Sequence, residues 1–443
     1  MSDNKIIDIL ISNGILVSMD KTTPYIKDGA VAVKKDKIVF AGDKKDMPVY
    51  KPITTIDAKG GIIMPGLVNT HTHAPMTCFR GLADDLPLMT WLNDYIFPAE
   101  ANLNPDMVYK GSLLACAEMI MSGTTCFCDM YIFEDFVAKA AKTAGMRALV
   151  GEGLFDFDSP NYGPLEKGFD YTKMLAEKWE QDDLISIAVM PHSPYLCAPP
   201  LLKKALLISE KYSLPLVIHL SETKKEVSII KNNYGATPVK HLANIGALSP
   251  SLVACHAVVL TEEDIPLLKK HNVKVSHNPQ SNMKLASGIA PVPKLMKNGI
   301  CVGLGTDGCA SNNDLDMFSE MDSAAKLHKV KELDPTVLDA LTVLKMATVN
   351  GASVLGMKDK IGSIETGKKA DIIIVDINKP HLTPMYAPCS HLVYSVTGGD
   401  VTTSVINGKL IMENRKLLTL DIEKIMADVR DIAKKIKYKR YKI

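Results

Sequence analysis

Two histidines separated by one residue, His71 and His73, are the first residues in the chain whose spacing suggests chemistry. They end a largely apolar stretch, GGIIMPGLVNTHTH, over residues 60–73. In an extended strand residues i and i+2 point to the same face, so both imidazoles can be directed at one point. Imidazole is the commonest side-chain metal ligand. The pair therefore indicates a metal site, although two unrelated surface histidines would give the same short pattern.

Further polar residues stand where other apolar runs end. A lone histidine is more often a structural residue than a ligand. Independent structural residues would scatter along the runs, whereas these recur at one end and predict one site built from several strand ends. They are His192 in MPHSPYLC, His219 in VIHLSE with Glu222 three residues later, His256 in ACHAV, His277 in SHNPQSN and Asp307 in GLGTDG.

The elements that must position these residues alternate between short apolar runs and helical patterns. Apolar strands that alternate with helices are typical of a parallel sheet covered on both faces. Eight such units predict an α/β fold, a closed (β/α)8 TIM barrel whose active site lies at the carboxyl ends of the strands. A doubly wound open sheet is the alternative, but no GxGxxG motif follows the first run. The runs are residues 62–70, 124–130, 147–154, 185–191, 215–220, 252–258, 273–278 and 301–306.

Both ends of the chain read as short strands broken by turns. They lie at residues 5–63 and in the segments 362–377, 391–396 and 403–416. With 443 residues the chain exceeds the roughly 250–300 at which a single core stops growing. We therefore expect a small β-sandwich domain built from both termini, residues 1–63 and 360–443 with a C-terminal helix, and a barrel over 64–359.

Composition narrows the class of protein. The 51 basic and 50 acidic residues give a net charge of +1, which offers no surface for nucleic acid or membrane. No apolar run approaches the ~20 residues of a membrane span, and MSDNKIIDIL lacks the apolar region of a signal peptide. The nine cysteines include no CxxC, which suits a reducing compartment. We expect a cytoplasmic protein that acts on a small molecule.

Five segments resemble the amidohydrolase superfamily: PGLVNTHTH, HLSE, CHAV, SHNPQSNMKLASG and GLGTDGCASNNDLDMF. The resemblance covers nearly the whole chain and is greatest to the 5′-methylthioadenosine/S-adenosylhomocysteine deaminases. It implies a homo-oligomer and a metal held by His71, His73, His219 and Asp307. Three neutral imidazoles and one carboxylate suit a divalent ion, Zn²⁺ before Fe²⁺, with a position left for water. Strand four offers His192 and no lysine to bridge two ions, which favours one metal.

The resemblance also implies hydrolytic deamination at C6 of an aminopurine nucleoside. A zinc-like ion lowers the pKa of water to about 7. Glu222 would move a proton from the water to ring N1, His256 would polarise or deprotonate the water, and Asp307 would pass a proton to the departing amine. Such acid–base steps each contribute about 10²–10⁴-fold. The structural alternative for Glu222 is an exposed acid stabilised by a helix dipole.

The first loop, APMTCFRGLADDLPLMTWLNDYIFPAEANL, carries the most specific part of the resemblance. There Trp91 would form an apolar wall beside the 5′ substituent, and Glu100 would accept from both ribose hydroxyls. His192 and Glu222 would also contact the nucleoside. A core aromatic and a helix cap are the alternatives for Trp91 and Glu100.

One departure from the family bears on the substrate. Members that accept S-adenosylhomocysteine often carry arginine in or after the third strand, where this chain has Glu152, and no arginine lies between Arg147 and Arg415. A bidentate carboxylate clamp is therefore not expected there, although Lys167 or a neighbouring subunit could substitute. The sequence favours small, uncharged 5′ groups, as in 5′-methylthioadenosine, 5′-deoxyadenosine or adenosine.

Two other functions stay open. One is another hydrolysis on the same scaffold, namely guanine or cytosine deamination or removal of chloride from a triazine. The other is a non-catalytic metal-binding barrel, against which the intact ligand set with Glu222 and His256 argues. The H-x-E and P-C-x-x-C pattern of zinc deaminases that act on nucleic acid is absent.

Overall fold

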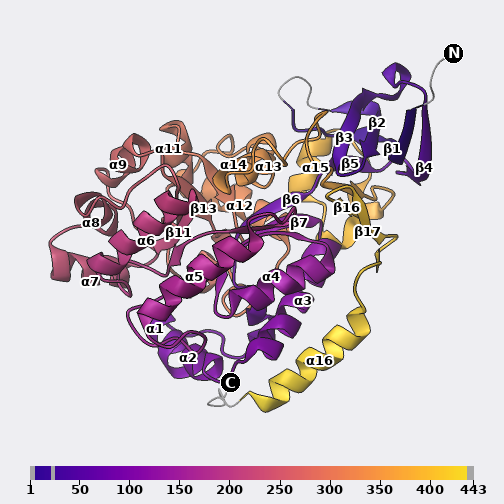
Figure 1. Cartoon of the computed structure of the whole chain (residues 1–443). Helices are drawn as coiled ribbons and strands as arrows, with labels where there is room; N and C mark the ends of the chain where they lie inside the picture. The colour runs from indigo at the N-terminus through magenta and orange to yellow at the C-terminus, as the bar shows by residue number, and fades with distance from the viewer. Residues whose placement is uncertain (1–4, 21–24, 437–443) are drawn as a thin grey trace.

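The computed structural model describes residues 5–20 and 25–436 (Figure 1). In it, strands from the middle of the chain lie next to one another in a closed ring. Neighbouring strands are parallel, and the bridges Val189–Leu216 and Thr72–Asp307 join the two sheets of the ring. The described residues thus form the predicted TIM-type barrel. Its strands are β6 (Leu67–Thr72), β7 (Thr124–Tyr131), β8 (Arg147–Leu154), β9 (Ile185–Ile187) with β10 (Met190–Pro191), β11 (Leu216–Leu220), β12 (Leu252–His256), β13 (Lys274–His277) and β14 (Val302–Leu304).

Apolar side chains fill the inside of the barrel. Val68, Leu149, Val217 and Val253 come from four different strands and belong to one buried cluster, which Met357 joins from the segment after β14. Burying each such side chain contributes roughly 1.5–3 kcal/mol. The barrel is therefore a packed core and not a pore, and room for a ligand remains only where the strands end.

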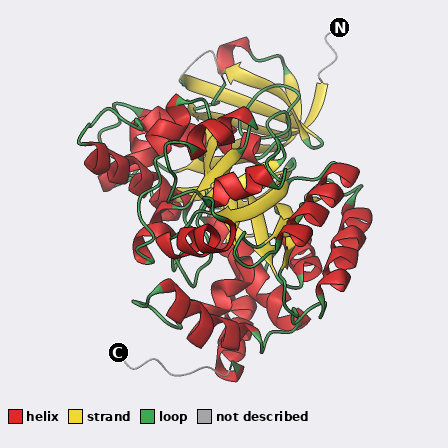
Figure 2. Ribbon diagram, turned by 90° about the vertical axis from the view of Figure 1, so that its left-hand side faces the viewer, coloured by secondary structure: helices red, strands yellow, loops and turns green. Residues whose placement is uncertain are grey.

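Helices surround the ring of strands (Figure 2). The side chains of Asn104 and Thr223 accept N-terminal amide hydrogen bonds of α3 and α7, and Gly145 and Gly235 end α4 and α7 in the left-handed conformation. None of the described helices combines the length and apolarity needed to cross a bilayer. The helices of this unit are α3 (Pro105–Met121), α4 (Glu134–Ala144), α5 (Leu165–Trp179), α6 (Pro199–Tyr212), α7 (Lys224–Tyr234), α8 (Pro238–Asn244), α9 (Asp264–Lys270), α10 (Pro279–Lys284), α11 (Val292–Lys297), α12 (Met317–Glu332), α13 (Ala340–Met346) and α14 (Val349–Val354).

The two ends of the chain pair into one nine-stranded sheet. Its link is β15, which pairs antiparallel with β5 on one side and β16 on the other. A separate core that includes Ile11, Val33 and Ile374 lies in this unit. The strands are β1 (Lys5–Leu16), β2 (Ile26–Lys34), β3 (Lys37–Asp43), β4 (Tyr50–Asp57), β5 (Ile62–Pro65), β15 (Ile372–Val375), β16 (Val401–Ile406), β17 (Lys409–Glu413) and β18 (Lys416–Leu417).

The pairing of strands in this sheet does not test two parts of the domain prediction. The description of the terminal unit as a sandwich, and its limits at residues 63 and 360, stay predictions. The predicted domain also includes residues 1–4, 21–24 and 437–443, which lie outside the described residues.

Two predicted strands differ in the structure. The run 62–70 is two strands, because Pro65 and Gly66 interrupt it: β5 joins the terminal sheet, and β6 begins the barrel. A side chain at Gly66 would overlap Thr125, so only glycine fits at this position. Segment 391–396 belongs mainly to helix α15 (Pro388–Tyr394), which proline begins at its first position.

The C-terminal helix α16 (Ile422–Lys435) forms as predicted and lies along α3 (Figure 1). Its buried residues Ile425, Val429 and Ile432 recur at helical spacing. Ile425 packs with Leu113 and Ala140 in a small cluster of its own. The apolar face of this helix is thus covered by the same chain.

A buried ion pair joins the barrel to the terminal sheet. Arg147, at the start of β8, donates through Nε to Asp371 Oδ2 at 2.8 Å and through Nη2 to Oδ1 at 3.1 Å. Both side chains are almost fully buried. The same carboxylate accepts from the amide of Asn407 at 2.8 Å. Asp371 therefore connects three segments that are distant in sequence.

We expect Asp371→Ala to lower the free energy of unfolding by about 3–5 kcal/mol, because Arg147 would keep a buried charge without a partner. Asp431→Ala, which removes the exposed pair with Lys434, is the control and should cost less than about 1 kcal/mol. Urea titration followed by circular dichroism measures both. Equal effects would contradict the role given to the buried pair.

Candidate active site

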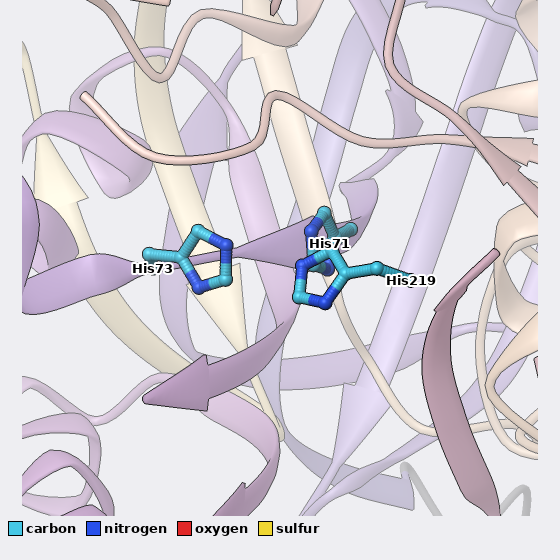
Figure 3. Close-up of side chains that lie close together, drawn as sticks. All are labelled: His71, His73 and His219. Atoms are coloured by element: carbon cyan, nitrogen blue, oxygen red, sulfur yellow. The ribbon is translucent and has the colours of Figure 1, made fainter. Parts of the chain in front are cut away.

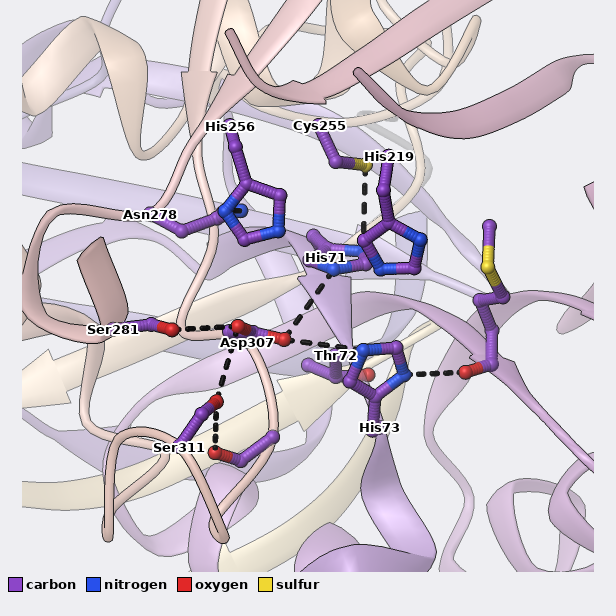
Figure 4. Close-up of polar contacts among 12 residues, drawn as sticks. His71, Thr72, His73, His219, Cys255, His256, Asn278, Ser281, Asp307 and Ser311 are labelled. Atoms are coloured by element: carbon purple, nitrogen blue, oxygen red, sulfur yellow. Dashed lines mark hydrogen bonds and ion pairs between the residues drawn. The ribbon is translucent and has the colours of Figure 1, made fainter. Parts of the chain in front are cut away.

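The four predicted metal ligands meet at the carboxyl ends of barrel strands: Figure 3 shows His71, His73 and His219, and Figure 4 adds Asp307. The ring centroid of His71 lies 4.8 Å from those of His73 and His219. One nitrogen from each of these rings lies within 4.8 Å of the other two. Oδ1 of Asp307 lies 3.1 Å from His73 Nε2 and 3.4 Å from His71 Nε2. The strand-end pattern in the sequence thus corresponds to one cluster in space.

Hydrogen bonds on the far side of two rings orient them. Nδ1 of His219 donates to the backbone carbonyl of His192 at 2.8 Å. Nδ1 of His73 donates to the backbone carbonyl of Met130 (Figure 4). In a neutral imidazole this leaves a lone pair on Nε2, the tautomer that a metal ligand needs.

The cluster holds acceptors that a cation would satisfy. Nε2 of His71 is buried and has no hydrogen-bond partner among the described residues, while its Nδ1 faces the Cys255 thiol at 3.4 Å. Imidazole lone pairs and the carboxylate of Asp307 repel one another in a buried site unless a cation lies among them. Three neutral nitrogens and a carboxylate oxygen are the donors that zinc or ferrous iron takes. These residues therefore fit one divalent ion.

Burial and charge shift the pKa values in the cluster. Burial lowers the pKa of His71 to about 4 and that of His219 well below its usual value. Burial also acts to lower the pKa of His73, but Asp307 outweighs it and raises that pKa to about 9. Burial opposes the charge of Asp307, yet the two histidine contacts hold its pKa well below the usual range. Metal binding would displace the His73 proton.

Hydroxyl groups hold the other oxygen of Asp307. Ser281 donates to Oδ2 at 2.6 Å and Ser311 at 3.0 Å (Figure 4). The backbone of Asp307 has a φ of 62°, which residues other than glycine seldom adopt. Its amide donates to the carbonyl of His71 at 2.9 Å and so closes the barrel at the site. Such local strain is typical of functional positions.

Glu222 and His256 approach each other beside the ligands. Oε2 of Glu222 lies 4.0 Å from Nε2 of His256. Nδ1 of His256 donates to Asn282 at 2.9 Å, which leaves Nε2 as a base. Burial raises the pKa of Glu222. A nitrogen of His256 also lies within 4.8 Å of atoms from two predicted ligands, so its role in proton transfer rather than ligation stays a prediction.

A pocket opens onto the cluster. Glu222, Trp91, Glu100 and His192 all line it, and their contact with substrate stays a prediction. Glu100 accepts from the hydroxyl of Tyr131 at 2.7 Å, and burial raises its pKa to about 7. Much of the lining is apolar, with a few converging polar side chains, as is typical of small-molecule sites. The first loop supplies much of the wall through η2 (Ala74–Phe79), α1 (Leu88–Trp91), the π-helix Leu92–Ile96 and α2 (Phe97–Glu100).

Sequence reasoning missed the residues that hold the functional side chains. Glu226 accepts from the amides of Ser221 and Glu222 at 2.8 and 2.7 Å, which fixes the turn after β11. Its spacing of four residues from Glu222 is the feature of the sequence that could have identified it as a supporting residue. Ser281 and Ser311 lie in the segments that carry the resemblance, but serine in a loop has no distinctive spacing.

One strand-end histidine lies outside the cluster. Nε2 of His277 lies 3.1 Å from Nε2 of His328 on α12, and both rings are buried. Among the described residues, neither histidine belongs to a group that could hold a metal. The alternation of side chains along β13 turns His277 away from the ligands. The position of His277 at a strand end does not by itself indicate which face of the strand its side chain occupies.

Comparison with known proteins agrees with this site. The sequence profile of the amidohydrolase family matches residues 62–411. The chain belongs to the amidohydrolase family. It is therefore a metal-dependent hydrolase, and the resemblance seen in the sequence is confirmed.

Relatives match over almost their full length. A 5-methylthioadenosine/S-adenosylhomocysteine deaminase from Syntrophobacter fumaroxidans is 54% identical over 431 residues, which are 97% of this chain and 98% of the relative. A 5′-deoxyadenosine deaminase from Methanosarcina acetivorans is 46% identical over 431 residues, with the same coverage. The crystal structure of an adenosine deaminase from Xanthomonas campestris with bound zinc has a TM-score of 0.96 and 40% identity, and the match covers 98% of this chain and 99% of that chain.

We expect His219→Ala to lose the metal, because one of three imidazole ligands is removed. His192→Ala is the matched control, since its ring centroid lies 4.5 Å from that of His219 but His192 belongs to no ligand group. Metal content after dialysis, measured by inductively coupled plasma mass spectrometry, should fall only in His219→Ala. Loss in both variants would mean that His192 is also a ligand.

Glu226→Gln should lower kcat by about 10- to 100-fold, because an amide cannot accept from both backbone N–H groups and Glu222 would shift. Steady-state kinetics and metal content measure the effect, and metal content should not change. Glu210→Gln, an exposed change on α6, is the control. Full activity of Glu226→Gln would contradict the positioning role.

Proposed function

We propose that this enzyme removes the 6-amino group of 5′-substituted adenosines by hydrolysis and releases ammonia. The observation that carries the proposal is the pairing of Glu222 with His256 at 4.0 Å beside the ligand cluster, in the pocket that both line. A proton donor and a proton acceptor next to a metal position are what hydrolytic deamination needs. The two curated relatives described above carry names of the same activity.

Zn²⁺ is the proposed ion, held by His71, His73, His219 and Asp307. When bound, it lowers the pKa of water so that a nucleophile is available near pH 7. The set of three imidazoles and one carboxylate favours it, and the similar adenosine deaminase holds zinc. Ferrous iron suits the same donors.

The side chains of this chain then move the protons. Glu222 takes a proton from the attacking water and delivers it to N1 of the purine, which breaks the aromaticity of the ring. Its raised pKa, caused by burial, favours the protonated form that this delivery requires. His256, whose Nδ1 is held by Asn282, directs Nε2 at the same water.

Asp307 and the first loop complete the roles. The serine hydroxyls hold Asp307 in position. Asp307 is proposed to accept the second proton of the attacking water and pass it to the departing amine, which leaves as ammonia. Glu100 is proposed to accept from the ribose hydroxyls, and Trp91 to lie beside the 5′ group. His192, which also lines the pocket, is proposed to contact the nucleoside.

The pocket favours an uncharged 5′ substituent. Its described lining includes no lysine or arginine, and the carboxyl groups of Glu100, Glu222 and Asp307 all lie in it. An amino-acid carboxylate would enter without a cationic partner, which is costly in a buried site. Glu152 is not part of the lining and accepts instead from two backbone amides and from Asn161 at 2.9 Å.

Apolar side chains are available where a small group would lie. The rings of Phe155 and Phe157 are stacked with centroids 4.8 Å apart, and Phe155 lies 5.3 Å from His192. Phe97 on α2 approaches Phe157 at 6.5 Å. Burial of a methyl or methylthio group against such a surface stabilises the complex, whereas burial of a charged homocysteine does not.

The test is deamination of 5′-deoxyadenosine, 5′-methylthioadenosine, adenosine and S-adenosylhomocysteine by the Zn²⁺-loaded enzyme, followed by absorbance as adenine becomes hypoxanthine. We expect kcat/KM for the uncharged substrates to exceed that for S-adenosylhomocysteine by at least about tenfold, which corresponds to 1.4 kcal/mol. Glu222→Gln should lower kcat by about 10²–10⁴-fold with metal retained.

Other outcomes would change the proposal. A preference for S-adenosylhomocysteine would keep the reaction and contradict the uncharged 5′ group. Absence of turnover with every adenosine would contradict the proposed activity and direct the search to guanine, cytosine and triazine substrates on the same metal site.

A further inference from the structure

Three carboxyl groups lie buried behind the strand that carries the metal-binding histidines. Asp129 is on β7, Glu134 is the first residue of α4, and Glu152 is on β8. All three are fully buried, and none lines the pocket. Charged carboxylates are seldom buried without cationic partners. The proton-transfer mechanism above does not use these groups, so their presence needs another explanation.

Asp129 holds the end of β6 from behind. Its Oδ1 accepts from the backbone amide of Ala74 and contacts the hydroxyl of Thr72, each at 2.5 Å. Thr72 and Ala74 are the residues on either side of His73. Asp129 therefore fixes the backbone that directs His73, and through Thr72 also His71, at the ion position.

The other oxygen of Asp129 faces a second carboxyl group. Oδ2 of Asp129 and both oxygens of Glu134 are buried and have no donor partner among the described N–H and O–H groups. The two carboxyl groups are in hydrogen-bond contact with each other. The Gly151 amide also acts on Glu134 and lowers its pKa, but this influence is smaller than those of burial, Asp129 and Glu152. Two carboxylates in such contact share one proton.

The surroundings decide which residue holds that proton. Asp129 has donors on Oδ1, which stabilise its charged form. For Glu134 the Gly151 amide favours a charge, and Glu152 opposes that charge more strongly as a second negative neighbour. Burial raises the pKa of Glu134 well above its usual value, and the charges of Asp129 and Glu152 act in the same direction. Glu152 itself accepts from Phe133, Glu134 and Asn161, so its oxygens are already occupied.

We propose that Glu134 is a neutral positioning residue for the metal site: its carboxyl proton is donated to Asp129, and Asp129 holds the strand end that presents His71 and His73. The proposal rests on the metal site proposed above but not on the deamination reaction. Groups that orient metal ligands from behind change metal affinity by about 10- to 100-fold when removed.

The first test measures Zn²⁺ affinity by competition with a chromophoric chelator, in Glu134→Leu and Glu134→Gln. Glu134→Leu removes the donor without adding charge and should weaken binding by about 10- to 100-fold. Glu134→Gln keeps a donor toward Asp129 and should bind as tightly as the wild type. Glu166→Leu is the control, because Glu166 is an exposed acid in the first turn of α5.

The second measurement is the infrared spectrum of the metal-free enzyme at neutral pH, in the wild type and in Glu134→Gln. The difference spectrum of wild type minus variant should show one C=O stretch of a protonated carboxyl group that the variant lacks. This readout does not depend on folding of Glu134→Leu, on bound metal or on turnover, so failure of the proposed function would leave it intact. An unchanged spectrum, or weak Zn²⁺ binding by Glu134→Gln, would overturn the proposal.

Discussion

The structure depends on one electrostatic constraint, the meeting of three imidazoles with the carboxylate of Asp307 inside the protein. Neutral imidazole nitrogens and a carboxylate oxygen all present lone pairs, and burial removes the water that would separate them. Such a group is stable only when a cation lies within it or when a proton takes the place of the cation. The raised pKa of His73 and the lowered pKa of Asp307 are the signature of the second state.

The barrel is the scaffold that allows these polar groups to be buried together. Its interior is packed with apolar side chains, so polar groups gather at the strand ends, where the backbone turns away and loops supply donors. Serine hydroxyls, backbone carbonyls and Asn282 orient the ligands and His256, and Glu226 orients Glu222. The buried Asp129–Glu134 pair extends the same support to the back of β6. Each functional side chain is thus held by a second group that takes no part in the reaction.

The pocket connects this centre to a substrate class. Its lining includes metal ligands with Glu222 and His256, together with residues of the first loop and Phe155 after β8. Acidic groups and apolar surface together favour a neutral nucleoside that offers donors to Glu100 and an apolar group to the phenylalanines. The homo-oligomeric state and the cytoplasmic location implied by the sequence stay predictions.

The sequence by itself determined the class of the fold, the family and the candidate ligands. Strand runs and the HxH spacing are local patterns, and the residues His71, His73, His219 and Asp307 stand at strand ends that a barrel brings together. Only the tertiary structure decided which strand-end residues face the centre: His277 turns toward His328, and β5 leaves the barrel for the terminal sheet. It also decided the supporting contacts of Glu226, Ser281, Ser311 and Glu134. These contacts join residues from separate loops and strands, or depend on the shape of a single turn. The direction of each side chain is set by packing, which the spacing of residues in the sequence does not encode.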